Sequence, residues 1–124
     1  MEIDVKEILF AYSEYIRLRI ILLLKDSEIC VNCLVASLGL PQSTISRHLG
    51  ILRRANVILA NRKAQNTYYT ANFQNDPLGN FNKELIDVYF KNMKDLPQYK
   101  EDRKNLLKQK DVCTVECKLD LKVA

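Results

Sequence analysis

The sequence predicts a mainly α fold with a small β-hairpin, and three observations support this prediction. Two short helical segments are separated by a turn that contains Gly39 and Pro41. Two strand-like segments, 57–61 and 67–71, follow and flank a polar tip. A longer helical segment begins after Pro77. Helix, tight turn, helix and hairpin, in that order, are the plan of a winged helix-turn-helix.

Two helices are expected before this unit. Residues 2–12 place apolar side chains in a mostly helical rhythm, and residues 14–24 are apolar on nearly all sides. Ser13 is the expected N-cap of the second helix. A helix that is apolar all round belongs in the core, so we expect Arg17 and Arg19 to emerge at its exposed edge.

The helix-turn-helix is expected over 31–55. Gly39 suits the left-handed residue that closes a first helix over 31–38. Pro41 cannot continue that helix but can begin the next one, over 42–55. Apolar residues of the second helix recur at helical spacing and are expected to face the core, and these are Ile45, Leu49 and Leu52.

The hairpin has its expected tip at residues 62–66. Asn66 belongs to this tip, and asparagine tolerates the positive φ that such turns require. Tyr68 and Tyr69 point to opposite faces of the second strand. At least one of the two tyrosines is therefore expected in the core.

Charge is distributed unevenly along the chain. The net charge is +4, but no Asp or Glu occurs from Ile29 to Asn75, where five basic residues lie. A field of one sign is typical of a phosphate-binding face, and an ordinary solvated surface is the alternative. For the hydroxyl residues of the second helix, the alternative is that they only stabilise the start of the helix and do not contact DNA. The residues that we expect to contact double-stranded DNA are Gln42, Ser43, Thr44, Ser46, Arg47, His48, Arg53, Arg54, Arg62 and Lys63.

A long helix is expected from Leu78 to about Leu96. Its apolar stripe is wide and aromatic, and consists of Phe81, Leu85, Ile86, Tyr89, Phe90 and Met93. We interpret this stripe as a homodimer interface shared with the first helix, with simple core packing as the alternative. We therefore expect a DNA-binding and dimerisation domain over 1–97. A C-terminal extension over 98–124 would carry a cysteine pair and a short helix.

Four cysteines form two close pairs, Cys30 with Cys33 and Cys113 with Cys117. The acidic N-terminus does not resemble a signal peptide, and no apolar run has membrane-spanning length. We expect a cytoplasmic protein without a membrane partner, in which a structural disulfide framework is disfavoured. Thiolates are favoured at a helix start and select soft ions. All four cysteines are therefore candidate metal ligands.

The cysteines leave several interpretations open. As(III) or Sb(III) needs three thiolates, and a four-thiolate zinc site is geometrically allowed. Cys30 and Cys33 could instead be small buried apolar side chains. His48, the single histidine, is remote from either pair. No organic cofactor is expected.

The run SEICVNCLVASLGLPQSTISRHLGILRRANVI, with the later Tyr68–Tyr69, resembles the arsenical-resistance repressors of the ArsR/SmtB family. The similarity extends from about Arg17 to Tyr69, and the run QSTISRHL is its most specific part. The resemblance implies a homodimeric winged-helix repressor. Such a protein binds operator DNA in the apo form and leaves it when a metal or metalloid binds.

This chain departs from the family pattern at four positions. Cys30 matches the first family cysteine, but Asn32 occupies the place of the second and Cys33 stands where Asp is usual. The family's trigonal arsenic site therefore cannot be transferred whole. The C-terminal cysteines resemble those of members that ligate arsenic from that region. Pro41 replaces a serine, and the hairpin tip lacks a glycine.

The resulting hypothesis is a non-enzymatic repressor of a metalloid-resistance operon that As(III) or Sb(III) releases from DNA. Cadmium, lead, thiol oxidation or persulfide formation could use the same sulfurs. Two alternatives come from other classes. One is a thiol oxidoreductase built on Cys30 and Cys33, although no βαβ pattern surrounds them. The other is a protein-interaction module that has lost DNA binding.

Overall fold

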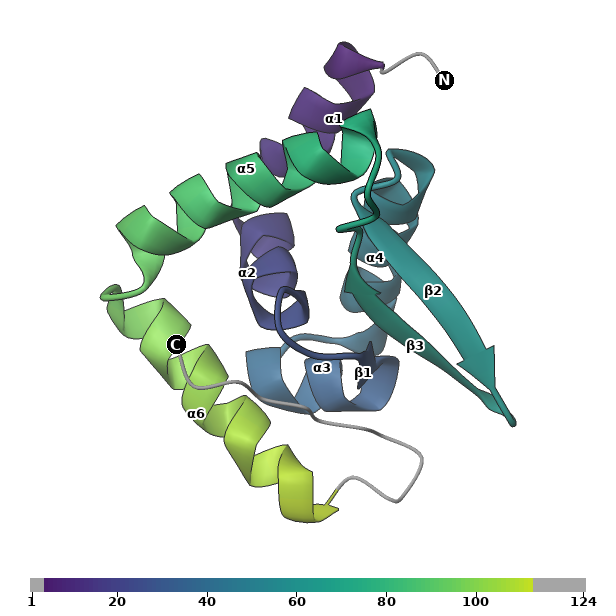
Figure 1. Ribbon diagram of the computed structural model, residues 1–124. Helices are drawn as coiled ribbons and strands as arrows, with labels where there is room; N and C mark the ends of the chain where they lie inside the picture. Colours follow the sequence, from purple (N-terminus) through teal and green to yellow (C-terminus); the bar gives the residue numbers. More distant parts are fainter. Residues whose placement is uncertain (1–3, 113–124) are drawn as a thin grey trace.

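The computed structural model describes residues 4–112 of the 124 (Figure 1). In chain order the elements are α1 (Val5–Tyr12), α2 (Tyr15–Leu24), β1 (Ile29–Cys30), α3 (Val31–Leu38), α4 (Gln42–Arg54), β2 (Ile58–Lys63), β3 (Asn66–Ala71), α5 (Pro77–Met93) and α6 (Pro97–Val112). The predicted mainly α, winged helix-turn-helix fold is confirmed. No helix among the described residues is long and apolar enough to cross a membrane.

Helix α2 lies at the centre of the fold, and its residues from Ile20 to Leu24 are buried. The prediction that Ser13 caps this helix is wrong. Ser13 ends α1, where its backbone N–H donates to the Phe10 carbonyl. Glu14 is the N-cap of α2, because its carboxylate accepts from the backbone N–H groups of Ile16 and Arg17.

The two arginines of α2 do not emerge at an exposed edge, so that prediction is also wrong. Arg17 is only 4 % exposed, and the side chain of Arg19 is only 12 % exposed. Buried guanidinium groups need hydrogen-bond acceptors. Both find them in other elements, which the periodicity of α2 alone cannot reveal.

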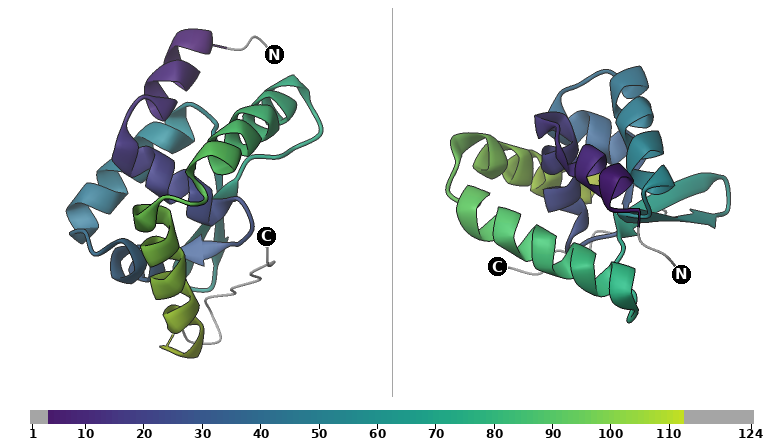
Figure 2. Two further views of the ribbon diagram at one scale, coloured as in Figure 1. Left: turned by 90° about the vertical axis from the view of Figure 1, so that its left-hand side faces the viewer. Right: turned by 90° about the horizontal axis from the view of Figure 1, so that it is seen from above.

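The sheet has three antiparallel strands in the order β1-β3-β2. The sequence reading missed β1, in which Cys30 pairs with Tyr68 of β3. Tyr68 is buried, as predicted for one of the two tyrosines. The hairpin β2–β3 extends away from the helices (Figure 2). At its tip the positive φ belongs to Ala64, at 54°, so the expectation for Asn66 is wrong.

Helix α5 is joined to the helix-turn-helix by the buried side chain of Asn82. The Tyr12 hydroxyl donates to Asn82 Oδ1 over 3.1 Å. Asn82 Nδ2 donates to the Asn56 carbonyl over 3.1 Å and to the Asn72 carbonyl over 3.4 Å. One amide therefore holds α5 to the end of α1, to the turn after α4 and to the chain leaving β3.

Helix α6 packs against α2 and α3. The expected short helix in the charged C-terminal segment is in fact 16 residues long. Helices α5 and α6 meet at a corner and enclose α2 (Figure 1). The division of the chain at residue 97 stays a prediction.

Candidate nucleic-acid interface and thiol site

The outer face of α4 is polar and exposed. Ile45, Leu49 and Leu52 are buried and anchor the opposite face in the core. Thr44 is half-buried, and the other predicted contact residues on this face are exposed, namely Gln42, Ser43, Ser46, Arg47, Arg53 and Arg54. Short hydroxyl, amide and guanidinium groups on one helix face can donate to phosphates and base edges. Their contact with DNA stays a prediction.

His48 does not belong to this exposed face. The side chain is only 6 % exposed, so the expectation that it faces outward is wrong. His48 Nδ1 lies 3.1 Å from Nη1 of Arg17. A guanidinium can only donate, so Nδ1 accepts and the ring proton of the neutral imidazole is on Nε2. His48 therefore lies behind the candidate DNA-contact surface.

The Arg17 guanidinium joins three helices. It donates from Nε to the Ala11 carbonyl and from Nη2 to the Phe10 carbonyl, each over 2.8 Å. It also lies 4.9 Å from the centroid of the Phe10 ring. Together with its bond to His48, these contacts connect the end of α1, through α2, to the middle of α4. Sequence reasoning missed this connection.

His48 should make stability depend on pH. Burial lowers the pKa of His48; Glu14 opposes this, whereas the positive charges of Arg17 and Arg47 add to it. The unfolded chain takes up a proton at about pH 6.5, whereas the folded chain does so only at lower pH. The contribution of His48 to the free energy of unfolding should therefore be complete above about pH 6.5. It should be lost as the pH falls below about 6.5 toward the lower pKa of the folded chain.

Urea unfolding at pH 7.5 and 5.5 measures this effect. His48 is the single histidine, so His48→Asn, whose amide oxygen can still accept from Arg17, should remove most of the pH dependence in this window. An equal pH dependence in the variant and the wild type would contradict the assignment.

At the hairpin, the two predicted basic residues differ in their surroundings. Arg62 is exposed, whereas Lys63 is half-buried and forms an ion pair with Glu28. The Asn61 side-chain amide also donates to Glu28, over 3.4 Å. Arg62 is therefore available to a phosphate in the described conformation, while Lys63 must first leave Glu28.

Cys30 and Cys33 both lie at the start of α3, as predicted. Cys30 ends β1 and occupies the N-cap position of α3, where it is half-buried. Cys33 is only 2 % exposed and is disulfide-bonded, although the sequence disfavoured a structural disulfide framework. Cys113 and Cys117 lie outside the described residues. Within residues 4–112, no three His, Cys, Asp or Glu side chains are grouped so that they could hold a metal ion.

The fold is similar to that of reduced HlyU from Vibrio cholerae, with a TM-score of 0.56 and 31 % sequence identity. This match covers 68 % of the chain and 86 % of HlyU. Residues 15–59 also match the model of the bacterial regulatory protein arsR family. The chain belongs to the arsR family. Because the family consists of regulators, the expectation that the protein is not an enzyme is confirmed, and the thiol-oxidoreductase alternative is excluded.

Curated members of the arsR family show local similarity to this chain. The HTH-type transcriptional repressor SmtB of Mycobacterium tuberculosis is 38 % identical over 63 residues, which cover 51 % of this chain and 47 % of SmtB. The arsenic resistance transcriptional regulator ArsR1 of Pseudomonas putida is 44 % identical over 49 residues, which cover 40 % of this chain and 38 % of ArsR1. The chain thus spans less than half the length of these two relatives.

Proposed function

We propose that this arsR-family protein is a transcriptional repressor that binds operator DNA as a homodimer. The observation that carries this proposal is the exposed polar and basic face of α4, whose opposite face is anchored in the core. The exposed Arg62 extends the basic surface to the hairpin, and no acid occurs between Ile29 and Asn75. In this arrangement α4 enters the major groove and the hairpin contacts the backbone or the minor groove.

Exposed apolar side chains support the homodimer. Val5, Leu9 and Phe10 on α1 are 51–58 % exposed, and Val88 on α5 is 57 % exposed. Large apolar side chains gathered on neighbouring helices are typical of protein interfaces. Helices α1 and α5 are themselves held together, since the Tyr12 and Tyr89 rings stack at 5.5 Å between centroids. A second copy of the same two helices is the partner that we propose.

For the inducer, we propose As(III) or Sb(III) bound by thiolates of the reduced protein. Cys30 and Cys33 would supply two sulfurs at the start of α3. Since such an ion takes three thiolates, the residues described can supply only part of the site. Cys113 or Cys117, in the proposed C-terminal extension over 98–124, would complete it. The similarity to a relative named as an arsenic resistance regulator supports this choice.

A ligand at Cys30 has a short route to the hairpin. Cys30 pairs with Tyr68 of β3, and Glu28, two residues earlier, holds Lys63 of β2. A shift of β1 therefore acts on both strands of the hairpin. DNA is released only if the inducer binds the shifted state more tightly than the DNA-bound state.

A thiol oxidation signal is the second candidate, and the disulfide at Cys33 is the observation that favours it. Two thiols would form the disulfide by losing two protons and two electrons to an oxidant such as a peroxide, which is reduced to water or an alcohol. A solved relative of this chain is named as reduced HlyU from Vibrio cholerae, which supports keeping a thiol-state signal as a candidate.

One titration tests both candidates. Fluorescence anisotropy would follow the reduced protein on its own upstream DNA while arsenite, cadmium, zinc or hydrogen peroxide is added. Release by arsenite alone supports the metalloid repressor, and release by peroxide that dithiothreitol reverses supports the redox repressor. Failure to bind duplex DNA at moderate salt would refute the repressor itself.

Replacing the cysteines should separate the sensing function from DNA binding. We expect Cys30→Ser with Cys113→Ser and Cys117→Ser to bind DNA with an affinity within about twofold of the wild type, because none of these residues lies on the exposed face of α4. Arsenite should no longer release this variant, since too few thiolates remain. Full arsenite release from the variant would show that the site is assigned wrongly.

A further inference from the structure

One acidic side chain contacts the basic surface of the hairpin. Glu28 immediately precedes β1, and its carboxylate forms an ion pair with Lys63, the last residue of β2. The side-chain amide of Asn61 donates to the same carboxylate over 3.4 Å. In the sequence Glu28 stands just before the acid-free stretch from Ile29 to Asn75, so the charge pattern alone leaves it outside the candidate DNA-contact surface. The fold brings it back to the hairpin.

The position of the Lys63 ammonium shows in which direction the ion pair holds this side chain. The strand order β1-β3-β2 places β3 between Lys63 and Glu28. Lys63 pairs with Asn66 next to the tip, whereas Tyr68, further from the tip, pairs with Asn61. The Lys63 ammonium lies 5.7 Å from the centroid of the Tyr68 ring. The side chain therefore crosses β3 and points toward the base of the hairpin, away from its tip.

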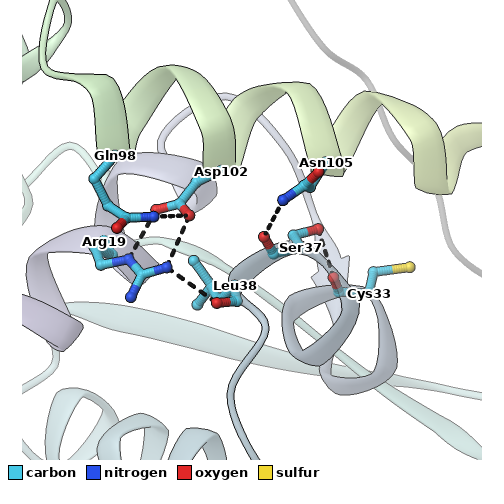
Figure 3. A network of polar contacts seen from close by, with 7 residues as sticks. All are labelled: Arg19, Cys33, Ser37, Leu38, Gln98, Asp102 and Asn105. Atoms are coloured by element: carbon cyan, nitrogen blue, oxygen red, sulfur yellow. Dashed lines mark hydrogen bonds and ion pairs between the residues drawn. The ribbon is translucent and has the colours of Figure 1, made fainter.

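This ion pair is open to solvent, unlike a buried pair of the same fold. Arg19 and Asp102, whose side chains are 12 % and 2 % exposed, join α2 to α6 inside the protein (Figure 3). Lys63 and Glu28 are 40 % and 25 % exposed. A surface pair contributes little to stability, and its members can exchange each other for water or for other ions. Lys63 is therefore a lysine that a DNA phosphate could take over if the carboxylate were removed.

We propose that Glu28 limits the affinity of the protein for DNA by keeping Lys63 from the phosphate backbone. This inference rests on the proposed binding of DNA through α4 and the hairpin. A lysine that neutralises a phosphate releases a condensed counterion, which favours binding. A lysine that is already neutralised by a carboxylate gains much less, and the carboxylate itself repels the phosphate. The exposed Arg62 is then the hairpin residue that contacts the backbone.

The effect of Glu28 should be independent of the DNA sequence. Contacts to phosphates position a protein on the duplex but carry no base information. By holding Lys63, Glu28 therefore lowers the affinity for operator DNA and for random DNA by the same factor. The ratio of the two affinities is left to the residues of α4 that reach the bases.

Glu28→Gln in the full-length reduced protein tests the proposal, with Glu101→Gln as its matched control. Glutamine keeps the side-chain length and an oxygen that accepts from Asn61, but it lacks the charge that holds Lys63. Glu101 is exposed on α6, which packs against α2 and α3, so the control removes the same charge far from the hairpin. Fluorescence anisotropy on the upstream DNA and on a random duplex of equal length, at several salt concentrations, gives the affinities and their salt dependence.

We expect Glu28→Gln to bind both duplexes about threefold or more tightly than the wild type does. The slope of log affinity against log salt concentration should be steeper by about 0.9 for each hairpin on the DNA, because each Lys63 now releases a counterion. Glu101→Gln should leave both quantities nearly unchanged. Affinities of Glu28→Gln equal to those of the wild type, or a gain confined to the upstream DNA, would overturn the inference.

A second substitution shows whether Glu28 acts through Lys63. In the Glu28→Gln protein, Lys63→Met should abolish the gain in affinity and the additional salt dependence. Lys104→Met, which removes an exposed lysine of α6 in the same background, should keep both. A gain that survives Lys63→Met would show that Glu28 only repels DNA as a nearby charge, and this too would overturn the inference.

Failure of the inference can be distinguished from failure of the proposed function. Circular dichroism should show that Glu28→Gln is folded, because the ion pair that it removes lies at the surface. A wild-type protein that binds neither duplex at moderate salt would overturn the proposed function, and this inference with it. A wild-type protein that binds DNA with an affinity that Glu28→Gln does not change would overturn the inference alone.

Discussion

Replacing Arg17 with methionine should lower the free energy of unfolding by about 3 kcal/mol, because buried acceptors lose their charged donor. The substitution keeps much of the apolar length of the side chain but removes the bonds to the Phe10 carbonyl, the Ala11 carbonyl and His48. The first two mark the end of α1, and the third lies in α4. Urea unfolding at pH 7.5 and constant protein concentration measures the loss.

Arg53→Met is the matched control for this prediction. Arg53 lies in the last turn of α4 and its side chain is exposed, so its replacement should change the free energy of unfolding by no more than about 0.5 kcal/mol. Equal effects of the two substitutions would show that the buried hydrogen bonds of Arg17 contribute nothing specific.

Replacing Arg47 with alanine should weaken binding to the operator by about 10- to 100-fold, which corresponds to the loss of one good base or phosphate contact. Arg47 is exposed on α4, and its neighbours on this helix, Ile45 and Leu49, are anchored in the core. The fold should therefore be unaffected. Fluorescence anisotropy at a fixed salt concentration gives the two dissociation constants.

Lys91→Ala provides the control for net charge. Lys91 is exposed on α5, so its loss changes the total charge equally but removes no group from the face of α4. Its DNA affinity should stay within about twofold of the wild type at the same salt concentration. If Lys91→Ala weakens binding as much as Arg47→Ala does, the interaction follows overall charge and α4 is not the reading surface.

The helix-turn-helix could be predicted from sequence because its signals are local. The apolar spacing of Ile45, Leu49 and Leu52 defines the buried side of α4, and Gly39 ends α3 with the positive φ that was expected. Both features depend on neighbours within a few residues. The same holds for α5, which begins after Asp76 as a capped helix.

His48 and Arg17 could not be placed from the sequence because each is buried against side chains or carbonyls of other helices. Polar side chains on a helix normally face water, and His48 was assigned to the exposed face for that reason. Its burial depends on Arg17, 31 residues earlier, which supplies the hydrogen bond. Such a pairing between distant residues leaves no periodic signal in either helix.

The strand β1 and the position of α6 were missed for different reasons. A strand of two residues, Ile29 and Cys30, is too short to show alternation. Helix α6 is highly charged, and the carboxylate of Asp102 makes its most buried polar contact. A search for apolar faces does not reveal a buried ion pair between residues that lie far apart in the sequence, such as Asp102 and Arg19.

The hydrogen bonds of Asn82 have a consequence for the DNA that the protein can occupy. They hold α5, the end of α1 and the turn after α4 in one rigid arrangement. If two copies pair through α1 and α5 as proposed, these hydrogen bonds within each chain fix the distance between the two α4 helices of the dimer. One extra base pair between two half-sites moves them apart by about 3.4 Å and turns one by about 35°. The protein should therefore reject operators whose half-sites carry the right bases at the wrong spacing.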